Sequence, residues 1–489
     1  MANLKKNLVY NFLLSFSQVM LPLISVPYLS RILDPEGIGK VSFIDSFTYY
    51  FISIAEFGIA IYGMREVARL RDNVEARGKL VSELLGLHVI TSSVTLVLYG
   101  VSVFFAWKHI QDMRLLLFSL SYLLINFLAC EWYFIGMEKF RYITLRSLLI
   151  RIAGLASMFI LIKGPEDYYV YYGIIVVSAI LSFSWNICLL FKEVPVSFKG
   201  ITLKKHISHT RVIYFISLTY GITLLLDNVY LRLMSTAAAV GLYAFSMKIV
   251  RISSSLITDS LLVFFPRIVV LANDEKSKGP QQVLLRNLQL LIFFSIPLSI
   301  GLFLTADQLV LVFLGEQFRP AIHDVKLLAV FPCLKAYNLF LGNQILIAYN
   351  KEKAYLKSLV ASGVVFTILA LLLSYYFADT GACVALLIAE AVTFTMNLSA
   401  VKQLIKGLQL FDTKSFLYAL GVSCLFIPVI YLVKKTGVPL IAQLSLSVLA
   451  CCLVYILIQF FVVRNAILLI IKAWILDTFF RKSTNASMK

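Results

Sequence analysis

Lysine and arginine residues inside apolar stretches are the main candidates for binding a charged ligand. Lys248 and Arg251 lie three positions apart in the stretch 241–264, and Ser255 and Asp259 follow on the same helical face, at about 100° per residue. Charges inside a membrane helix are costly, and by default they line a wet cavity or pair with one another. We predict that Lys248 and Arg251 bind an anionic substrate. A salt-bridge network is the alternative, and for Asp259 it is the favoured interpretation.

Other charged residues within apolar stretches are candidates by the same argument. Further candidates for a substrate cavity are Lys335, which comes shortly after a proline, and Arg151, Arg31 and Arg232. The last two lie at the ends of their stretches, so the alternative is a side chain that reaches up to the membrane interface. The candidates for ion coupling or for salt bridges are acidic: Asp45, Glu56, Asp227, Asp259 and Glu390.

Patterns typical of enzymes and metal sites are absent from the sequence. The seven cysteines lie scattered in apolar stretches apart from one neighbouring pair, and no spacing predicts a metal site or a disulfide framework. No glycine-rich phosphate loop indicates ATP binding. His206 and His209 fall in a basic linker, where we expect both to be solvated. The sequence therefore predicts no cofactor, no metal and no enzymatic activity.

The elements that would position these residues are membrane helices. Hydrophobic residues make up 60% of the chain and charged residues 14%, against about 25% charged residues in soluble domains. Apolar runs of about 20 residues match the thickness of a bilayer. We predict an all-α integral membrane protein with about 14 transmembrane helices, at 8–30, 41–64, 81–106, 115–136, 143–162, 168–191, 212–231, 241–264, 287–306, 327–349, 355–377, 381–401, 415–433 and 438–462.

The net charge of +18 reports topology and does not indicate nucleic acid binding. With the N-terminus inside, about thirty of the 44 Lys and Arg residues fall in inner segments and about ten in outer ones. Both termini are then cytoplasmic. Anionic lipid of the bilayer is the expected surface partner.

A short pattern of residue spacing occurs twice in the chain, about 200 positions apart. A polar turn, Asp-Pro-Glu-Gly, separates the first two apolar stretches, and the residues after it, from Ile38 to Phe43, match Val240 to Phe245 in spacing. A copy after six helices keeps its orientation, so the pattern predicts two six-helix lobes related by a parallel repeat. The predicted parts are an N-terminal lobe (1–200), a C-terminal lobe (201–412), and two further helices with an interfacial tail (413–489).

Three motifs resemble bacterial polysaccharide flippases. The segment Arg31-Ile-Leu-Asp-Pro-Glu-Gly-Ile-Gly-Lys-Val-Ser-Phe43 is similar to the Arg-x-Leu-Gly-Pro-Glu-x-Tyr-Gly signature of that family. Glu56-Phe-Gly58 with Arg65-Glu66, and Glu131-Trp-Tyr-Phe-Ile-Gly-Met-Glu-Lys-Phe-Arg-Tyr142, resemble two more of its patterns. The chain departs from the family with Asp34 in place of glycine, Ile38 in place of an aromatic residue and Ile135 in place of glutamine.

The family is that of the O-antigen and capsule repeat-unit flippases, within the multidrug/oligosaccharidyl-lipid/polysaccharide exporter superfamily. The resemblance implies a multi-pass protein of the bacterial cytoplasmic (inner) membrane. It implies that the protein moves an undecaprenyl-pyrophosphate-linked oligosaccharide, an intermediate of lipopolysaccharide or capsule synthesis, to the outer leaflet by alternating access. H+ or Na+ would be the coupling ion, and polysaccharide polymerase machinery a partner. The alternatives are a drug/cation antiporter of the same superfamily and, more distantly, a membrane-embedded polysaccharide polymerase or ligase.

Overall fold

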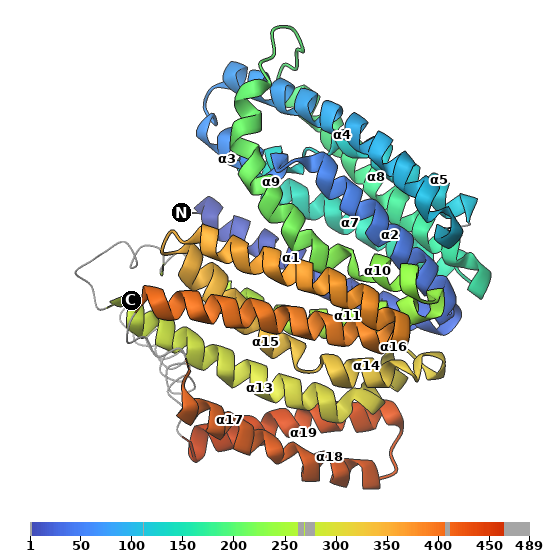
Figure 1. Ribbon diagram of the computed structural model, residues 1–489, viewed down its shortest axis with the longest axis vertical. Helices are drawn as coiled ribbons and strands as arrows, with labels where there is room; N and C mark the ends of the chain where they lie inside the picture. The colour runs from blue at the N-terminus through green and yellow to red at the C-terminus, as the bar shows by residue number, and fades with distance from the viewer. Residues whose placement is uncertain (1, 111, 263–267, 269–278, 406–410, 464–489) are drawn as a thin grey trace, which may run out of the picture. The chain divides into compact units, whose positions relative to one another are not determined.

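The chain folds as helices, as the sequence predicted. The computed structural model describes residues 2–110, 112–262, 268, 279–405 and 411–463, and these residues contain no strand (Figure 1). Ten of their helices are long and apolar enough to cross a membrane, or eleven if a bent pair is counted as one span. The total of 14 stays a prediction. The expected interfacial tail from residue 464 onward lies outside the described residues.

The chain divides into two compact units. Unit 1 comprises Met1–Phe245 and Phe366–Ala385, and unit 2 comprises Ser246–Val365 and Leu386–Lys489. The helices up to the shared α11 are α1 (Ala2–Ile32), α2 (Pro35–Glu56), α3 (Ile59–Arg69), α4 (Val74–Ile110), α5 (Met113–Ile125), α6 (Glu131–Gly136), α7 (Phe140–Leu161), α8 (Tyr168–Glu193), α9 (Lys204–Leu225), α10 (Asp227–Met234) and α11 (Ala237–Leu262).

The remaining helices lie mainly in unit 2. They are α13 (Gly279–Phe313), α14 (Ala321–Leu328), α15 (Phe331–Leu339), a π-helical stretch (Phe340–Ile347), α16 (Glu352–Leu404), α17 (Thr413–Cys424), α18 (Phe426–Lys435) and α19 (Leu440–Phe461). The long α16 contains a reversal at Ala378, where φ is 48°. The parts of α16 before and after this position correspond to the predicted spans 355–377 and 381–401, and whether each crosses a membrane stays a prediction.

The Asp-Pro-Glu-Gly turn is the start of a helix. Asp34 caps α2 by accepting a hydrogen bond from the backbone N–H of Gly37 at 2.7 Å, and Pro35 occupies the first helical position. Aspartate is a good N-cap, and proline suits the first turn because no partner is needed there for its missing N–H. The second span therefore begins at Pro35, six residues earlier than the predicted start at 41.

Two of the glycines in the repeated pattern contact each other's helices within unit 1. A Cβ added to Gly39 in α2 would lie 1.7 Å from the carbonyl oxygen of Ala237, and a Cβ added to Gly241 in α11 would lie 1.9 Å from that of Pro35. The two contacts mirror each other, because Gly241 and Ala237 lie 202 positions after Gly39 and Pro35. Small residues four apart allow two backbones to approach this closely.

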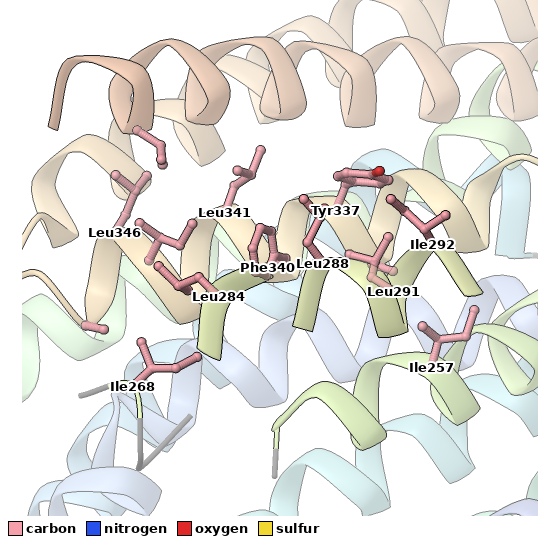
Figure 2. Packing of buried hydrophobic residues seen from close by; sticks show 14 of the residues in the cluster. Ile257, Ile268, Leu284, Leu288, Leu291, Ile292, Tyr337, Phe340, Leu341 and Leu346 are labelled. Carbon is pink, nitrogen blue, oxygen red and sulfur yellow. The ribbon is translucent and has the colours of Figure 1, made fainter. Parts of the chain in front are cut away.

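Each unit has its own apolar core. In unit 1, α2 packs against α4, α5, α8 and α9. In unit 2, α13 packs against α15, α17 and α19. Figure 2 shows part of the second core, where Leu288 and Leu291 of α13 lie beside Tyr337 and Phe340. These cores hold the polar side chains described next.

Candidate functional site

Two candidate residues meet inside unit 2. The ammonium of Lys335 on α15 lies 2.7 Å from Oε1 of Glu390 on α16. Asn338, one helical turn after Lys335, donates to Oε2 of Glu390 at 2.6 Å and to its backbone carbonyl at 2.9 Å. The side chain of Glu390 is 6% exposed and that of Lys335 21% exposed. The carboxylate is therefore enclosed, and the ammonium keeps partial access to the surroundings.

The local sequence explains why Lys335 lies where it does. Pro332 falls in the first turn of α15, where a missing N–H costs nothing, so the helix starts just before Lys335. The chain then continues as the π-helical stretch Phe340–Ile347. A π-helix inside a helical span shifts the register of the side chains after it and often marks a functional site.

Glu390 begins a buried polar stripe on the second half of α16. Thr393 and Asn397 follow it at three and seven positions and are 4% and 0% exposed. Asn397 accepts a hydrogen bond at 2.7 Å from Ser358, which lies on the first half of the same helix. A stripe of this kind faces protein, because lipid would leave its polar groups without partners.

The predicted cationic pair on α11 lies in unit 2 as well. Lys248 and Arg251 are both half-buried and lie one turn apart on the helix, which confirms their common face. The Ser255 hydroxyl donates to the carbonyl of Ile252 in its own helix at 2.8 Å. The side chain of Asp259 lies outside the part of the chain that the structure describes.

The three arginine candidates of unit 1 bond to nearby polar groups. Arg151 on α7 donates to the hydroxyl of Ser17 on α1 at 2.6 Å, so it joins two helices. Arg31 is exposed and donates to the carbonyl of Pro27 at 2.7 Å. Arg232 is half-buried and donates to the carbonyl of Ser235 at 3.2 Å.

The acidic candidates of unit 1 differ in burial. Asp227 is 1% exposed, and it accepts hydrogen bonds from the Tyr243 hydroxyl at 3.2 Å and from the backbone N–H of Asn228 at 2.8 Å. Asp45 and Glu56 on α2 are half-buried. Among the candidate residues, Lys335 and Glu390 form an ion pair although 55 positions separate them in the sequence.

Sequence reasoning missed two buried ionic clusters. His206 was expected to be solvated, but it is 1% exposed and lies 2.9 Å from the carboxylate of Glu83. Arg146 is 3% exposed and binds Glu131 and Asn186. The prediction for His206 was wrong because the polar linker folds back onto a helix that lies more than a hundred positions earlier in the chain. No local pattern marks such a contact. The side chain of His209 lies outside the described part.

Two carboxylates outside the spans have perturbed acidity. Burial acts to raise the pKa of Asp112, but hydrogen bonds from Arg114 and Tyr168 outweigh it, and the pKa is lowered. For Asp412, burial again acts to raise the pKa, and hydrogen bonds from Gln289 and Ser415 lower it below its usual value. Both carboxylates are therefore held in the charged form by their partners.

Two observations bear on what the described residues could bind. They contain no group of three or more His, Cys, Asp or Glu side chains arranged to hold a metal ion. A cavity of about 380 Å³ lies in unit 2 between α13, α18 and α19, with Phe293, Phe426 and Tyr455 in its wall. Most of its lining is apolar, so it does not suit an oligosaccharide.

The chain is similar to one family profile and to two proteins named as O-antigen transporters. The sequence profile of a family described as "Polysaccharide biosynthesis protein" matches residues 4–272. The chain is 24% identical over 411 residues to a "Putative O-antigen transporter" of Escherichia coli (strain K12), covering 82% of this chain and 97% of the relative. A protein of the same name from Shigella dysenteriae is 23% identical over 402 residues, covering 82% of this chain and 100% of the relative.

Solved structures share the fold. The lipid II flippase MurJ in an inward closed conformation matches with a TM-score of 0.69 and 16% identity, covering 92% of this chain and 99% of that one. An inward-facing multidrug resistance transporter of the MATE family matches with a TM-score of 0.57 and 13% identity, covering 80% and 96%. The match to the family spans more than half of the chain. The predicted relationship is therefore confirmed: the chain belongs to the polysaccharide biosynthesis protein family.

Proposed function

We propose that the protein moves a polyprenyl-pyrophosphate-linked oligosaccharide repeat unit from the inner to the outer leaflet of the bacterial cytoplasmic membrane. Support comes from the O-antigen transporters that it resembles over 82% of its length. The lipid flippase fold is consistent with such a cargo. Both termini would be cytoplasmic, and the polysaccharide polymerase machinery would be a partner.

The structural observation that carries the proposal is the environment of Lys335. Its ammonium is held by a buried carboxylate in an apolar unit, yet its side chain stays 21% exposed. A pyrophosphate entering a low-dielectric region needs cations that compensate its charge, and an ammonium is a suitable point-charge partner. Lys335 can exchange Glu390 for a phosphate oxygen, and Lys248 and Arg251 are further cations of unit 2 for this purpose. Arg151, Arg31 and Arg232 are further candidates, and each of them donates to a group of unit 1.

The movement would be alternating access between two six-helix lobes, residues 1–200 and 201–412. The mirrored contacts of Gly39 and Gly241 support this proposal, because equivalent corners of a parallel repeat would meet about an axis between them. H+ or Na+ would be the coupling ion, with Asp45, Glu56, Asp227, Asp259 and Glu390 as the acidic candidates.

The test is export by variants in a host that lacks its own copy of the gene. We expect Lys335→Ala, and the double variant Lys248→Ala/Arg251→Ala, to reduce surface polysaccharide at least about tenfold at matched protein levels. The lipid-linked repeat unit should accumulate on the inner leaflet. Lys351→Ala is the matched control, because Lys351 is exposed in the loop before α16. Wild-type export by both Lys335→Ala and Lys248→Ala/Arg251→Ala would refute the role of these cations.

A drug/cation antiporter is the second candidate. It is favoured by Asp45 and Glu56, two half-buried acids on α2, because acids suit a cationic cargo. The two functions differ in cargo. Two results would favour the antiporter. The protein would export a cationic dye and lose this activity in Asp45→Asn, and a strain that lacks the gene would keep normal surface polysaccharide.

A further inference from the structure

The segment that joins α8 to α9 lies against α4 within unit 1. We call residues 194–203 the connecting segment. A Cβ added to Gly78 of α4 would lie 2.5 Å from the carbonyl oxygen of Pro195, so only glycine allows this approach. One turn further along α4, Ser82 accepts a hydrogen bond at 2.9 Å from the backbone N–H of Ser197. The connecting segment is therefore bound along a groove of small residues.

A buried carboxylate holds the end of this segment. Glu83 of α4 is 0% exposed. Its Oε1 accepts from the backbone N–H of Thr202 at 3.2 Å and from the Thr202 hydroxyl at 2.9 Å. Its Oε2 lies 2.8 Å from the ammonium of Lys205 and 2.9 Å from Nε2 of His206. One side chain thus joins α4 to both the connecting segment and the first turn of α9.

The histidine of this cluster bridges two elements. His206 is 1% exposed, and its Nδ1 lies 2.9 Å from the hydroxyl of Tyr62 on α3. A neutral imidazole can donate from Nε2 to Glu83 and accept from the Tyr62 hydroxyl at Nδ1. An imidazolium can donate from both nitrogens, because a tyrosine hydroxyl also accepts. Both protonation states therefore fit the same arrangement of heavy atoms.

The two cations that share Glu83 differ in their access to water. The side chain of Lys205 is 53% exposed, whereas those of His206 and Glu83 are 2% and 1% exposed. Lys205 can leave for solvent at little cost, but Glu83 cannot lose all compensating charge while it is buried. The titratable and charged groups that face the site from the three helices are Tyr62, Arg65, Glu66 and Arg69 of α3, Glu83 of α4, and Lys205 and His206 of α9.

We propose that Tyr62, His206, Glu83 and Lys205 form a proton-binding site that controls the hold on the connecting segment. A proton from water adds to Nδ1 of neutral His206, the imidazolium then compensates Glu83, and the Lys205 ammonium turns to solvent. Loss of the proton reverses each step. A hydrogen bond from an imidazolium to a carboxylate is stronger than one from a neutral imidazole, so the bound proton tightens the hold of Glu83 on α9, where the connecting segment ends. The further step, that this proton is the coupling ion of export, rests on the proposed function.

The site is tested by titrating the histidines of the full chain in lipid nanodiscs. Imidazole carbon–proton signals of the wild type are recorded from pH 5 to pH 8.5, and the His206→Gln spectrum assigns the signal of His206. His323→Gln is the control for histidine loss, because His323 is exposed on α14. We expect one His206 step in this range. Hydrogen exchange of residues 194–206, corrected for the intrinsic effect of pH, should slow on acidification with the same midpoint. No step, or exchange that does not follow it, overturns the site.

A second variant keeps the test valid if His206→Gln fails to fold. Lys205→Met removes the cation that shares Glu83 with His206, so the midpoint of the His206 step should differ from that of the wild type. Lys204→Met removes the neighbouring exposed ammonium and should leave the midpoint in place. Equal His206 midpoints in Lys205→Met and Lys204→Met would overturn the proposal that Lys205 and His206 share Glu83. Flipping of lipid-linked substrate in proteoliposomes is measured separately. A wild-type pH profile in His206→Gln would refute the coupling role, and it would leave both the titration and the proposed function in place.

Discussion

Replacing Gly39 by alanine tests the close contact between α2 and α11 in unit 1. The new Cβ would lie 1.7 Å from the carbonyl oxygen of Ala237, and real Cβ contacts are essentially never shorter than 3.0 Å. The atoms in the way belong to backbone, so α2 and α11 would have to separate by about 1.3 Å at this point. Overpacking of this kind typically costs about 1–3 kcal/mol.

The assay is apparent melting in detergent, followed by size-exclusion chromatography of the heated protein. At about 2 °C per kcal/mol for a chain of this size, the midpoint should fall by about 2–6 °C. Gly100→Ala in α4 is the matched control. Its Cβ would meet nothing within 4 Å, so the melting midpoint should stay or rise slightly.

The double variant Gly39→Ala/Gly241→Ala gives a sharper result. The Cβ at Gly241 would lie 1.9 Å from the carbonyl of Pro35, which is the mirrored contact of the same crossing. One separation of the helices relieves both contacts, so the double variant should cost clearly less than the sum of the two single variants. Additive losses, or a Gly39→Ala protein as stable as Gly100→Ala, would refute the reasoning.

Three further predictions concern the polar contacts. Glu390→Gln removes the buried charge that lies 2.7 Å from the Lys335 ammonium, and it should destabilise the protein by about 3–5 kcal/mol in the same melting assay. Lys335→Met/Glu390→Gln should recover a large part of this loss. Equal losses in the two variants would contradict the pairing. Arg151→Met removes the 2.6 Å hydrogen bond to Ser17, so the melting midpoint should fall while export per folded molecule persists. Loss of export by a variant as stable as the wild type would instead place Arg151 at the substrate. The Asp412 pKa is lowered in the fold, so its stabilising contribution is complete above the usual pKa of 3.8 and is lost as the pH falls through the folded value. The melting midpoint of Asp412→Asn should therefore fall less steeply with pH than that of the wild type below about pH 4. Equal slopes in the two proteins would contradict this.

Much of the helical layout could be predicted because it depends on local composition. Runs of apolar residues locate the helices. The spacing around Gly39 and Gly241 predicts that the two positions correspond, and each of them lies against the other's helix. Lys335 and Glu390 were each recognised as costly charges in apolar stretches. Their 2.7 Å pairing could not be predicted, because 55 positions separate them and no pattern links α15 to the second half of α16.

The cluster around His206 shows the limit of sequence reasoning. A histidine in a basic linker has the composition of a solvated residue, yet burial here depends on Gly78 and Ser82 of α4, which let a distant segment approach. Three-dimensional proximity of this kind is set by the whole fold. The same holds for Arg146, whose partners Glu131 and Asn186 lie 15 and 40 positions away.

The bound connecting segment also determines where foreign sequence can be inserted. Connections between helices usually accept epitope tags and fluorescent fusions, because they cover the surface loosely. An insertion between Pro195 and Thr202 would instead break the backbone contacts to α4. The turn at Gly437 between α18 and α19 offers an open alternative, since a Cβ there would meet nothing within 4 Å. Tags at that turn should preserve the fold, and tags in the connecting segment should not.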